Sequence, residues 1–496
     1  MIPSARQTRA DGAATATASP SAPARNGAGM PIAPKRYYRQ SLTWSTCGSL
    51  ECAQVKVPLD YRHPGTSIEL ALVRRPATKP TERIGALVVN PGGPGASGID
   101  YARAAEQSFS TDVLDHYDIV GFDPRGVGES DQVRCIGNAA MDTWTSMDVT
   151  PDTKAEVRAL RSFDHAFARA CLRHTGPLLG HVSTVESAAD MDIIRAALGE
   201  PRLNFFGASY GTLLGATYAQ EFPARVGRFV LDGALSTDLN SKGMPIAQAK
   251  GFETALDAFI ADCVKLRDCP LGRRAGTART KLADFLHRLD QHPLPTTSGR
   301  VLTQQQGETG VVTALYSKQT WVALRIGLRQ AFAGNGATLL ALADAYNGRD
   351  PTGSYADSLL PPNIAINCLD SGQAGTSVKQ IEKQRQAYES AAPIFGDSAR
   401  WSGLMCHDWP VRSPYDSPKL VAEGAAPIVV IGTTRDPATP YAWAKQMANT
   451  LASGVLLTRD GDGHTGYFKG DACIDSAVDA YLIDATVPKR GTRCQG

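Results

Sequence analysis

The chain has 496 residues, of which 43% are hydrophobic and 20% are charged, with 51 basic against 49 acidic side chains. These values are those of a globular protein and exclude a disordered or fibrous one. The charges are balanced and scattered, which gives no sign of nucleic-acid binding, and no run approaches the roughly 20 apolar residues of a membrane span.

Residues 1–40 are predicted to form a disordered leader. The first thirty-odd positions are rich in Ala, Ser, Thr, Pro and Gly and contain no apolar block of the kind that a secretory signal needs. Two interpretations stay open: an export signal has been trimmed or mis-started, or the protein is cytoplasmic.

Alternation of apolar and polar residues at 55–59 and 67–74 predicts two half-buried antiparallel strands. Short apolar runs follow, each ending in a glycine-rich or acidic turn. This pattern predicts buried parallel strands. Helical periodicity separates them, for example at 185–198 and 213–221. The pattern predicts an α/β fold with a mostly parallel sheet flanked by helices. The parallel strands are expected at 86–90, 117–122, 203–206, 229–231 and 426–431.

The alternation of strand and helix stops after Asp232 and resumes near Pro427. Mostly helical patterns lie between, with a Pro/Gly/Thr-rich break at 292–310. We therefore expect a large helical cap inserted between the sixth and seventh predicted strands. The predicted units are a core at 41–235 and 426–496 and a cap at 236–425. The helices of the cap are expected at 246–266, 320–333 and 338–346.

The strongest motif is the G-x-S-x-G sequence at 207–211, which lies between a predicted strand and a predicted helix. In this setting the motif is typical of a nucleophile elbow, a tight turn that exposes the serine hydroxyl at the edge of the sheet. The sequence thus predicts Ser209 as a nucleophile, in an α/β-hydrolase fold.

A nucleophilic serine needs a base and an acid that orients the base, and this fold supplies them in the order Ser, Asp, His. Asp436 follows the predicted strand at 426–431, and His464 follows a strand-like run through a glycine turn. We predict Ser209, Asp436 and His464 as the catalytic triad. His407 is the one rival histidine.

The reaction also needs an oxyanion hole. Its donors are predicted to be the backbone N–H of Tyr210 and an N–H of the glycine-rich loop at 90–95, with Gly93 favoured and Gly92 beside it. The segment at 123–130 is a further fingerprint, whose Asp123 and Arg125 are interpreted as structural. Asp232 is a candidate for the lining of the cleft or for the framework.

These motifs resemble those of the secreted bacterial tripeptidyl aminopeptidases and the related carboxylesterase A group of serine proteases, relatives of the prolyl aminopeptidases. The resemblance extends over nearly all of residues 44–494. It rests chiefly on Asn90–Gly95 (NPGGPG), Asp123–Ser130 (DPRGVGES), Gly207–Thr212 (GASYGT), Asp436–Pro440 (DPATP) and Gly463–Thr465 (GHT).

The resemblance implies the same triad of Ser209, Asp436 and His464, the Gly92–Gly93 turn as oxyanion loop, and export from the cell. Ten cysteines in neighbouring pairs agree with export, because disulfides persist outside the cytoplasm. Proximity in the chain predicts the pairs 47–52, 135–171, 263–269, 368–406 and 473–494; buried free thiols are the alternative. We expect a secreted or cell-envelope location.

The expected reaction is acyl transfer to Ser209 with no metal and no organic cofactor, which releases di- or tripeptides from free N-termini. A carboxylesterase or amidase acting on small acyl substrates is the first alternative, because the same triad cleaves both kinds of bond. A catalytically silent binding module is the second. The sequence gives no indication of oligomeric state.

Overall fold

The computed structural model of the protein describes residues 30–495 except 238–242, 357 and 372–375. A ten-stranded sheet runs through it in the order β1-β2-β3-β5-β4-β6-β7-β10-β11-β12. The strands β1, β2, β3 and β5 pair antiparallel, and all pairs from β5 to β12 are parallel. Their bounds are Ser45–Cys47 (β1), Leu50–Pro58 (β2), Ser67–Arg75 (β3), Gly85–Asn90 (β4), Tyr117–Phe122 (β5), Leu203–Ala208 (β6), Val226–Asp232 (β7), Ile428–Arg435 (β10), Gly454–Asp462 (β11) and Arg493–Gln495 (β12).

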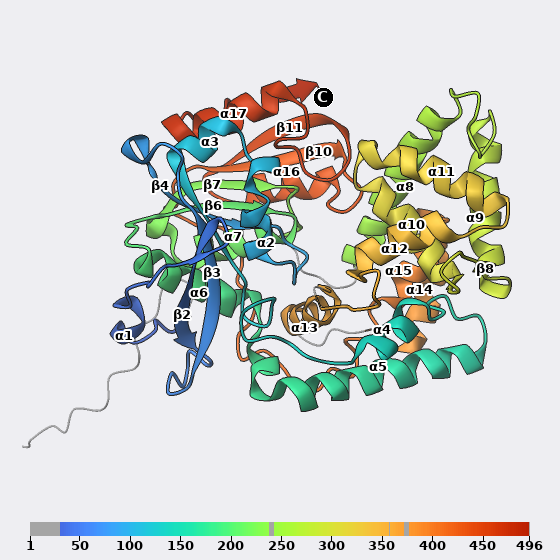
Figure 1. Ribbon diagram of the computed structural model, residues 1–496, viewed down its shortest axis with the longest axis horizontal. Helices are drawn as coiled ribbons and strands as arrows, with labels where there is room; N and C mark the ends of the chain where they lie inside the picture. Colours follow the sequence, from blue (N-terminus) through green and yellow to red (C-terminus); the bar gives the residue numbers. More distant parts are fainter. Residues whose placement is uncertain (1–29, 238–242, 357, 372–375, 496) are drawn as a thin grey trace, which may run out of the picture.

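Helices cover both faces of the sheet (Figure 1). One face packs against α2 (Gly98–Arg103), α3 (Thr111–His116) and α17 (Ala472–Asp484). The other packs against α6 (Thr184–Ala197), α7 (Tyr210–Glu221) and α16 (Tyr441–Thr450). Because the central strands are buried on both sides, they read as continuous apolar runs rather than as alternating ones. The predicted α/β-hydrolase fold with its mostly parallel sheet is confirmed.

A second, helical layer lies between β7 and β10 in the chain and forms the right-hand part of Figure 1, except for α13, which lies nearer the sheet and contributes to the sheet core. Its helices share a hydrophobic core of their own, to which α8, α9, α10, α11 and α12 contribute. The bounds are Met244–Cys263 (α8), Ala275–Gln291 (α9), Gln304–Leu315 (α10), Trp321–Phe332 (α11), Ala337–Asn347 (α12), Leu360–Asp370 (α13), Val378–Ala391 (α14) and Gly396–Trp401 (α15).

The sequence predicted a break in the helical pattern at 292–310, but the break in the structure is shorter. A short hairpin of β8 (Leu294–Pro295) and β9 (Val301–Leu302) occupies its first half, and α10 begins at Gln304. A capping box starts this helix: the Thr303 side chain accepts from the N–H of Gln306, whose side chain accepts from the N–H of Thr303. These Thr and Gln residues suggested a loop in the sequence, but in the structure they begin a helix.

The carboxyl end of the predicted leader is ordered, because Met30, Ala33 and Tyr37 are buried in the core. The rest of the leader, residues 1–29, lies outside the described residues. Proximity in sequence also found the right cysteine partners. All ten cysteines form the five predicted disulfides, 47–52, 135–171, 263–269, 368–406 and 473–494.

A second insertion, between β5 and α6, was not anticipated. It carries α4 (Asn138–Thr145) and the long α5 (Lys154–Thr175), which runs along the lower edge of Figure 1. The amino-terminal part of α5 packs Leu160 against Ile381 and Trp401 of the helical layer, and its later part packs Phe167 against the sheet core. The helix therefore joins the two layers. None of the described helices has the length and apolar character that crossing a membrane requires.

Arg125, interpreted from the sequence as structural, is fully buried beneath the sheet edge. Its Nε and Nη2 donate to the two carboxylate oxygens of Asp190 at 2.7 Å each. Its remaining N–H groups donate to the backbone carbonyls of Pro58, Leu59 and His181. The guanidinium thus joins β2, the turn after β5 and α6.

Replacing this guanidinium should destabilise the fold strongly. We expect Arg125→Met to lower the free energy of unfolding in urea by about 3–5 kcal/mol, because the buried Asp190 carboxylate would keep only the Tyr61 hydroxyl as a donor and would lose its counter-charge, and three carbonyls would lose their Arg125 donors. The control is Arg103→Met, which removes an exposed guanidinium paired with Asp100 and Glu129. It should cost less than about 1 kcal/mol. Similar losses of unfolding free energy in the two variants would contradict the structural role assigned to Arg125.

Candidate active site

The predicted site residues all lie at the carboxyl ends of parallel strands. Ser209 follows β6, Asp436 follows β10, His464 lies just beyond β11, and the Gly92–Gly93 turn follows β4. These strands are near neighbours in the order β4-β6-β7-β10-β11, so their carboxyl ends share one edge of the sheet. At such an edge, loops from different strands converge on one ligand.

Ser209 occupies a backbone conformation that residues other than glycine rarely adopt, with φ 56° and ψ −124°. Such strain persists only where the surroundings hold it. Here the Ser209 N–H donates to the Asp232 carbonyl at 2.8 Å, and the Thr212 N–H and hydroxyl donate to the Ser209 carbonyl at 2.9 and 2.6 Å. The turn between β6 and α7 is thereby fixed.

Gly92 brings the glycine-rich loop directly against this turn. Its φ is +99°, and a Cβ atom added to it would lie 2.6 Å from the Ala208 carbonyl oxygen and 2.8 Å from the Tyr210 nitrogen. Only glycine permits this approach. The loop after β4 and the N–H of Tyr210 are therefore neighbours, as an oxyanion hole requires.

The three predicted oxyanion residues differ in what their N–H groups do. The Gly92 N–H donates to Oδ1 of Asn90 at 3.0 Å. Within the described part of the chain, the N–H groups of Gly93 and Tyr210 have no hydrogen-bond acceptor. Tyr210 is the first residue of α7, a position whose N–H has no partner inside the helix. Gly93 and Tyr210 are thus the two donors available to a ligand.

His464 and Asp436 form a close pair. His464 Nδ1 lies 2.9 and 3.0 Å from the two carboxylate oxygens, and the Asp436 side chain is fully buried. The same carboxylate accepts from the N–H groups of Ala438, Thr439 and Thr465 at 2.8 to 3.1 Å. Its orientation is therefore set by four donors.

The electrostatics of His464 follow from these neighbours. Burial disfavours the charged imidazolium, but the nearby carboxylate of Asp436 and the more distant one of Asp232 outweigh this effect and raise the pKa of His464 above its usual value. Lys469 opposes the two carboxylates and lowers that pKa. Among the described residues, no hydrogen bond joins the imidazole to Ser209.

Asp232 contributes more than sequence reasoning assigned to it. Its buried carboxylate accepts from the N–H of Gly466 at 2.8 and 3.0 Å and from the N–H of Tyr467 at 2.9 Å, just after His464. Burial raises the pKa of Asp232 to about 6, and these N–H donors act in the opposite direction. Because its own carbonyl accepts from the Ser209 N–H, Asp232 connects the serine turn, which is the turn at Ser209, to the histidine loop, which contains His464, Gly466 and Tyr467.

Tyr316, at the end of α10 in the helical layer, was not predicted at all. Its carbonyl accepts from the backbone N–H of His464 at 2.8 Å. The two rings meet edge to face, with centroids 5.4 Å apart and an interplanar angle of 90°. The helical layer thus touches the predicted base directly.

The helix α13 makes a second contact with the site. Asn363 Nδ2 donates to the carbonyl of Pro94 in the glycine-rich loop at 2.9 Å. Further along the helix, Asp370 accepts from the Thr184 hydroxyl, which in turn accepts from the Tyr210 hydroxyl. These long-range contacts fix the loop and the first turn of α7 from the cap side.

His407, the rival base, is exposed and lies beside α5, where it lines a surface groove with Arg158 and His165. It makes no contact with Ser209 or Asp436 in the described residues. The structure therefore pairs His464, and not His407, with Asp436, at the edge of the sheet where Ser209 also lies.

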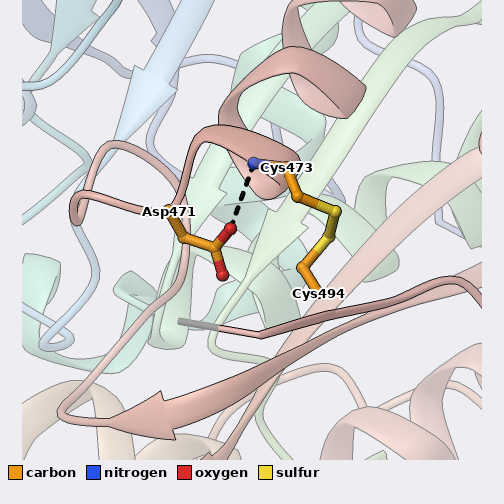
Figure 2. Close-up of side chains that lie close together, drawn as sticks. All are labelled: Asp471, Cys473 and Cys494. Carbon is orange, nitrogen blue, oxygen red and sulfur yellow. Dashed lines mark hydrogen bonds between the residues drawn. A yellow bond between two sulfur atoms is a disulfide. The ribbon is translucent and has the colours of Figure 1, made fainter.

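One group of side chains has the composition of a metal site. Asp471, Cys473 and Cys494 bring an oxygen and two sulfur atoms within 4.8 Å of one another. Figure 2 shows the two sulfur atoms joined in a disulfide and the carboxylate turned to the Cys473 N–H, at 3.1 Å. The sulfurs are therefore not thiolates, and Asp471 caps α17.

Comparison with known proteins places the chain among hydrolases. Residues 392–494 match the family model described as TAP-like protein. The serine protease Hip1 of Mycobacterium tuberculosis is 39% identical, over 92% of this chain and 91% of that protein. Carboxylesterase B of the same organism is 36% identical, over 94% and 92%. A tripeptidyl aminopeptidase of Streptomyces lividans is 29% identical, over 95% and 89%.

The close approach of Gly92 can be tested by adding one methyl group. We expect Gly92→Ala to lower kcat for an ester reporter by at least about a hundredfold, because the Cβ would push the loop away from Tyr210. Gly334→Ala is the matched control, since Gly334 has φ +92° but no atom within 4 Å of an added Cβ. It should leave kcat unchanged. Equal effects would mean that backbone strain alone, and not the contact, matters.

Proposed function

The chain belongs to the TAP-like family of α/β-hydrolases that includes the mycobacterial serine protease Hip1 and carboxylesterase B, and we propose that Ser209, His464 and Asp436 are its catalytic triad. The protein is a serine hydrolase, and its proposed substrates are peptides. The observation that carries the proposal is the buried Asp436–His464 pair beside the strained Ser209 turn.

In the proposed mechanism, His464 Nε2 removes the proton of the Ser209 hydroxyl as the oxygen attacks the scissile carbonyl. Nδ1 keeps its proton and donates a hydrogen bond to the Asp436 carboxylate, which fixes the tautomer and stabilises the imidazolium. The N–H groups of Gly93 and Tyr210 receive the oxyanion. His464 then protonates the leaving amine, and water releases the acyl group from Ser209 by the same steps.

We further propose that the enzyme removes short peptides from free N-termini. Two features support an exopeptidase: the helical layer touches the His464 loop through Tyr316, and α13 touches the glycine-rich loop through Asn363. An insertion that contacts both of these loops would limit the length of the peptide substrate that can enter the site. The proposed domain limits are those of the sequence, with the cap at 236–425.

A carboxylesterase or amidase is the second candidate, and the 36% identity to a protein named carboxylesterase B favours it. The silent binding module is disfavoured by the paired His464 and Asp436, which a scaffold without turnover has no need to retain.

Peptide or small acyl substrates fit both of the remaining candidates. From the five disulfides and the similarity to a tripeptidyl aminopeptidase, we infer that the protein acts outside the cytoplasm, secreted or associated with the cell envelope.

Reporter peptides separate the two candidates. We expect tripeptidyl reporters with a free amine to be cleaved at least about tenfold faster in kcat/KM than their N-acetylated forms, a difference near 1.4 kcal/mol in transition-state stabilisation. Ser209→Ala should abolish both activities and the labelling by a fluorophosphonate. Faster turnover of acyl esters than of any peptide would support the esterase instead.

The pH profile tests the role of His464. A general base works in its neutral form, so kcat/KM should fall as pH falls through the raised pKa of His464, with a midpoint above 6.5. Lys469→Met removes a cation that lowers this pKa, so the midpoint should move to higher pH at low ionic strength. Lys469→Arg keeps the charge and should leave it in place. A midpoint that moves down in Lys469→Met would refute the assignment.

A further inference from the structure

The outward face of α5 carries a row of basic side chains. Successive members are three or four residues apart, so they lie on one side of the helix. The buried residues Leu160, Phe167 and Cys171 lie on the opposite side. All members of the row are exposed, and they are Lys154, Arg158, Arg161, His165, Arg169 and Arg173.

No acid compensates this row. Among the described residues, none of its six members has a carboxylate within 4.0 Å or a hydrogen bond from its side chain, whereas Arg103 and Arg279 each pair with two carboxylates. Glu156 is turned back to the N–H of Thr153 in a capping box. Asp164 is buried, and burial together with Asp408 raises its pKa to about 7.

The row borders a groove of about 790 Å³ between α5 and residues 407–409. Arg158, Arg161 and His165 line one wall, and the other wall carries His407 and Asp408. The adjoining disulfide of Cys406 with Cys368 ties that wall to α13. The groove therefore has four cationic or titratable basic groups against one exposed acid.

We propose that this face of α5 and its groove bind a linear polymer of phosphate groups. The row spans 20 residues, its ends are about 28 Å apart at 1.5 Å per residue, and a basic side chain occurs every ~6 Å. A chain of phosphates can meet several of these charges at once, whereas a single ion can meet only two or three. Four of the six members are arginines, whose fork of N–H donors suits phosphate oxygens.

An anionic membrane fits this face less well. Helices that lie in a bilayer surface insert an apolar side, but the apolar side of α5 is buried in the protein. Leu172 is the one large hydrophobic side chain exposed on the helix, at 39%. The proposal is independent of the hydrolase assignment, because the row contains no residue of the candidate active site.

The test uses fluorescently labelled long-chain inorganic polyphosphate and the full-length protein, with binding followed by anisotropy. We expect the triple variant Arg158→Gln, Arg161→Gln and Arg169→Gln to bind at least about tenfold more weakly. The slope of log Kobs against log salt should also become shallower by about 2, as expected when three phosphate contacts are lost.

The matched control carries Arg273→Gln, Arg274→Gln and Arg490→Gln, which remove three other exposed arginines and cause the same change in net charge. It should bind within about twofold of the parent. Both variants should hydrolyse ester reporters at the parental rate, which also shows that they fold.

Three outcomes would overturn the proposal. Equal weakening in both triple variants would mean that only net charge matters. Orthophosphate that competes as well as polyphosphate, phosphate for phosphate, would indicate an adventitious ion only. Binding to vesicles of phosphatidylglycerol without binding to polyphosphate would assign the face to a membrane surface.

Discussion

The arrangement of the site depends on one buried residue, Asp232 at the end of β7. Its carbonyl accepts from Ser209, and its carboxylate accepts from Gly466 and Tyr467. Because β7 lies between the strand that carries Ser209 and the strand that carries Asp436, this side chain can hold the loops on either side of it. Placing a carboxylate in the core is costly unless it is hydrogen-bonded. The backbone N–H groups offset that cost, and their geometry fixes the distance between the serine turn and the histidine loop.

The helical layer helps to position the loops of the candidate site and does not only cover them. Tyr316 holds the backbone of His464, and Asn363 holds the carbonyl of Pro94. Each contact joins a loop of the sheet to a helix of the insertion, so the proposed base and the proposed oxyanion loop are both held by helices of the insertion. A movement of the helical layer would therefore alter the chemistry as well as the access of substrate. The Cys368–Cys406 disulfide restrains such movement at α13.

The sheet, the family and the candidate residues Ser209, Asp436 and His464 at one edge of the sheet could be predicted because their signals are local. A strand, a glycine turn and a polar residue are adjacent in the chain, and five cysteine pairs are close in sequence. Tyr316 and Asn363 could not be predicted, since their importance lies in contacts with residues more than 140 and 260 positions away. The hydrogen bond of the Gly92 N–H is local, because Asn90 is two positions away, but the residue spacing alone gives no sign of it. Only the fold shows that Asn90 occupies its N–H, which leaves Gly93 as the available donor.

The distribution of charge on α5 is a further feature that the composition of the sequence did not reveal. A sum of 51 basic and 49 acidic residues, with no long run of either, suggests an even surface. Helical spacing changes this conclusion, because residues three and four apart in the chain become neighbours on one face. The acids that should neutralise α5 are removed from that face, Glu156 by its capping role and Asp164 by burial. Some surface cations of the helical layer, by contrast, meet carboxylates, as Arg279 and Arg300 do. This face of α5 holds no residue of the candidate active site, so the proposed binding there and the proposed turnover at Ser209 can proceed together.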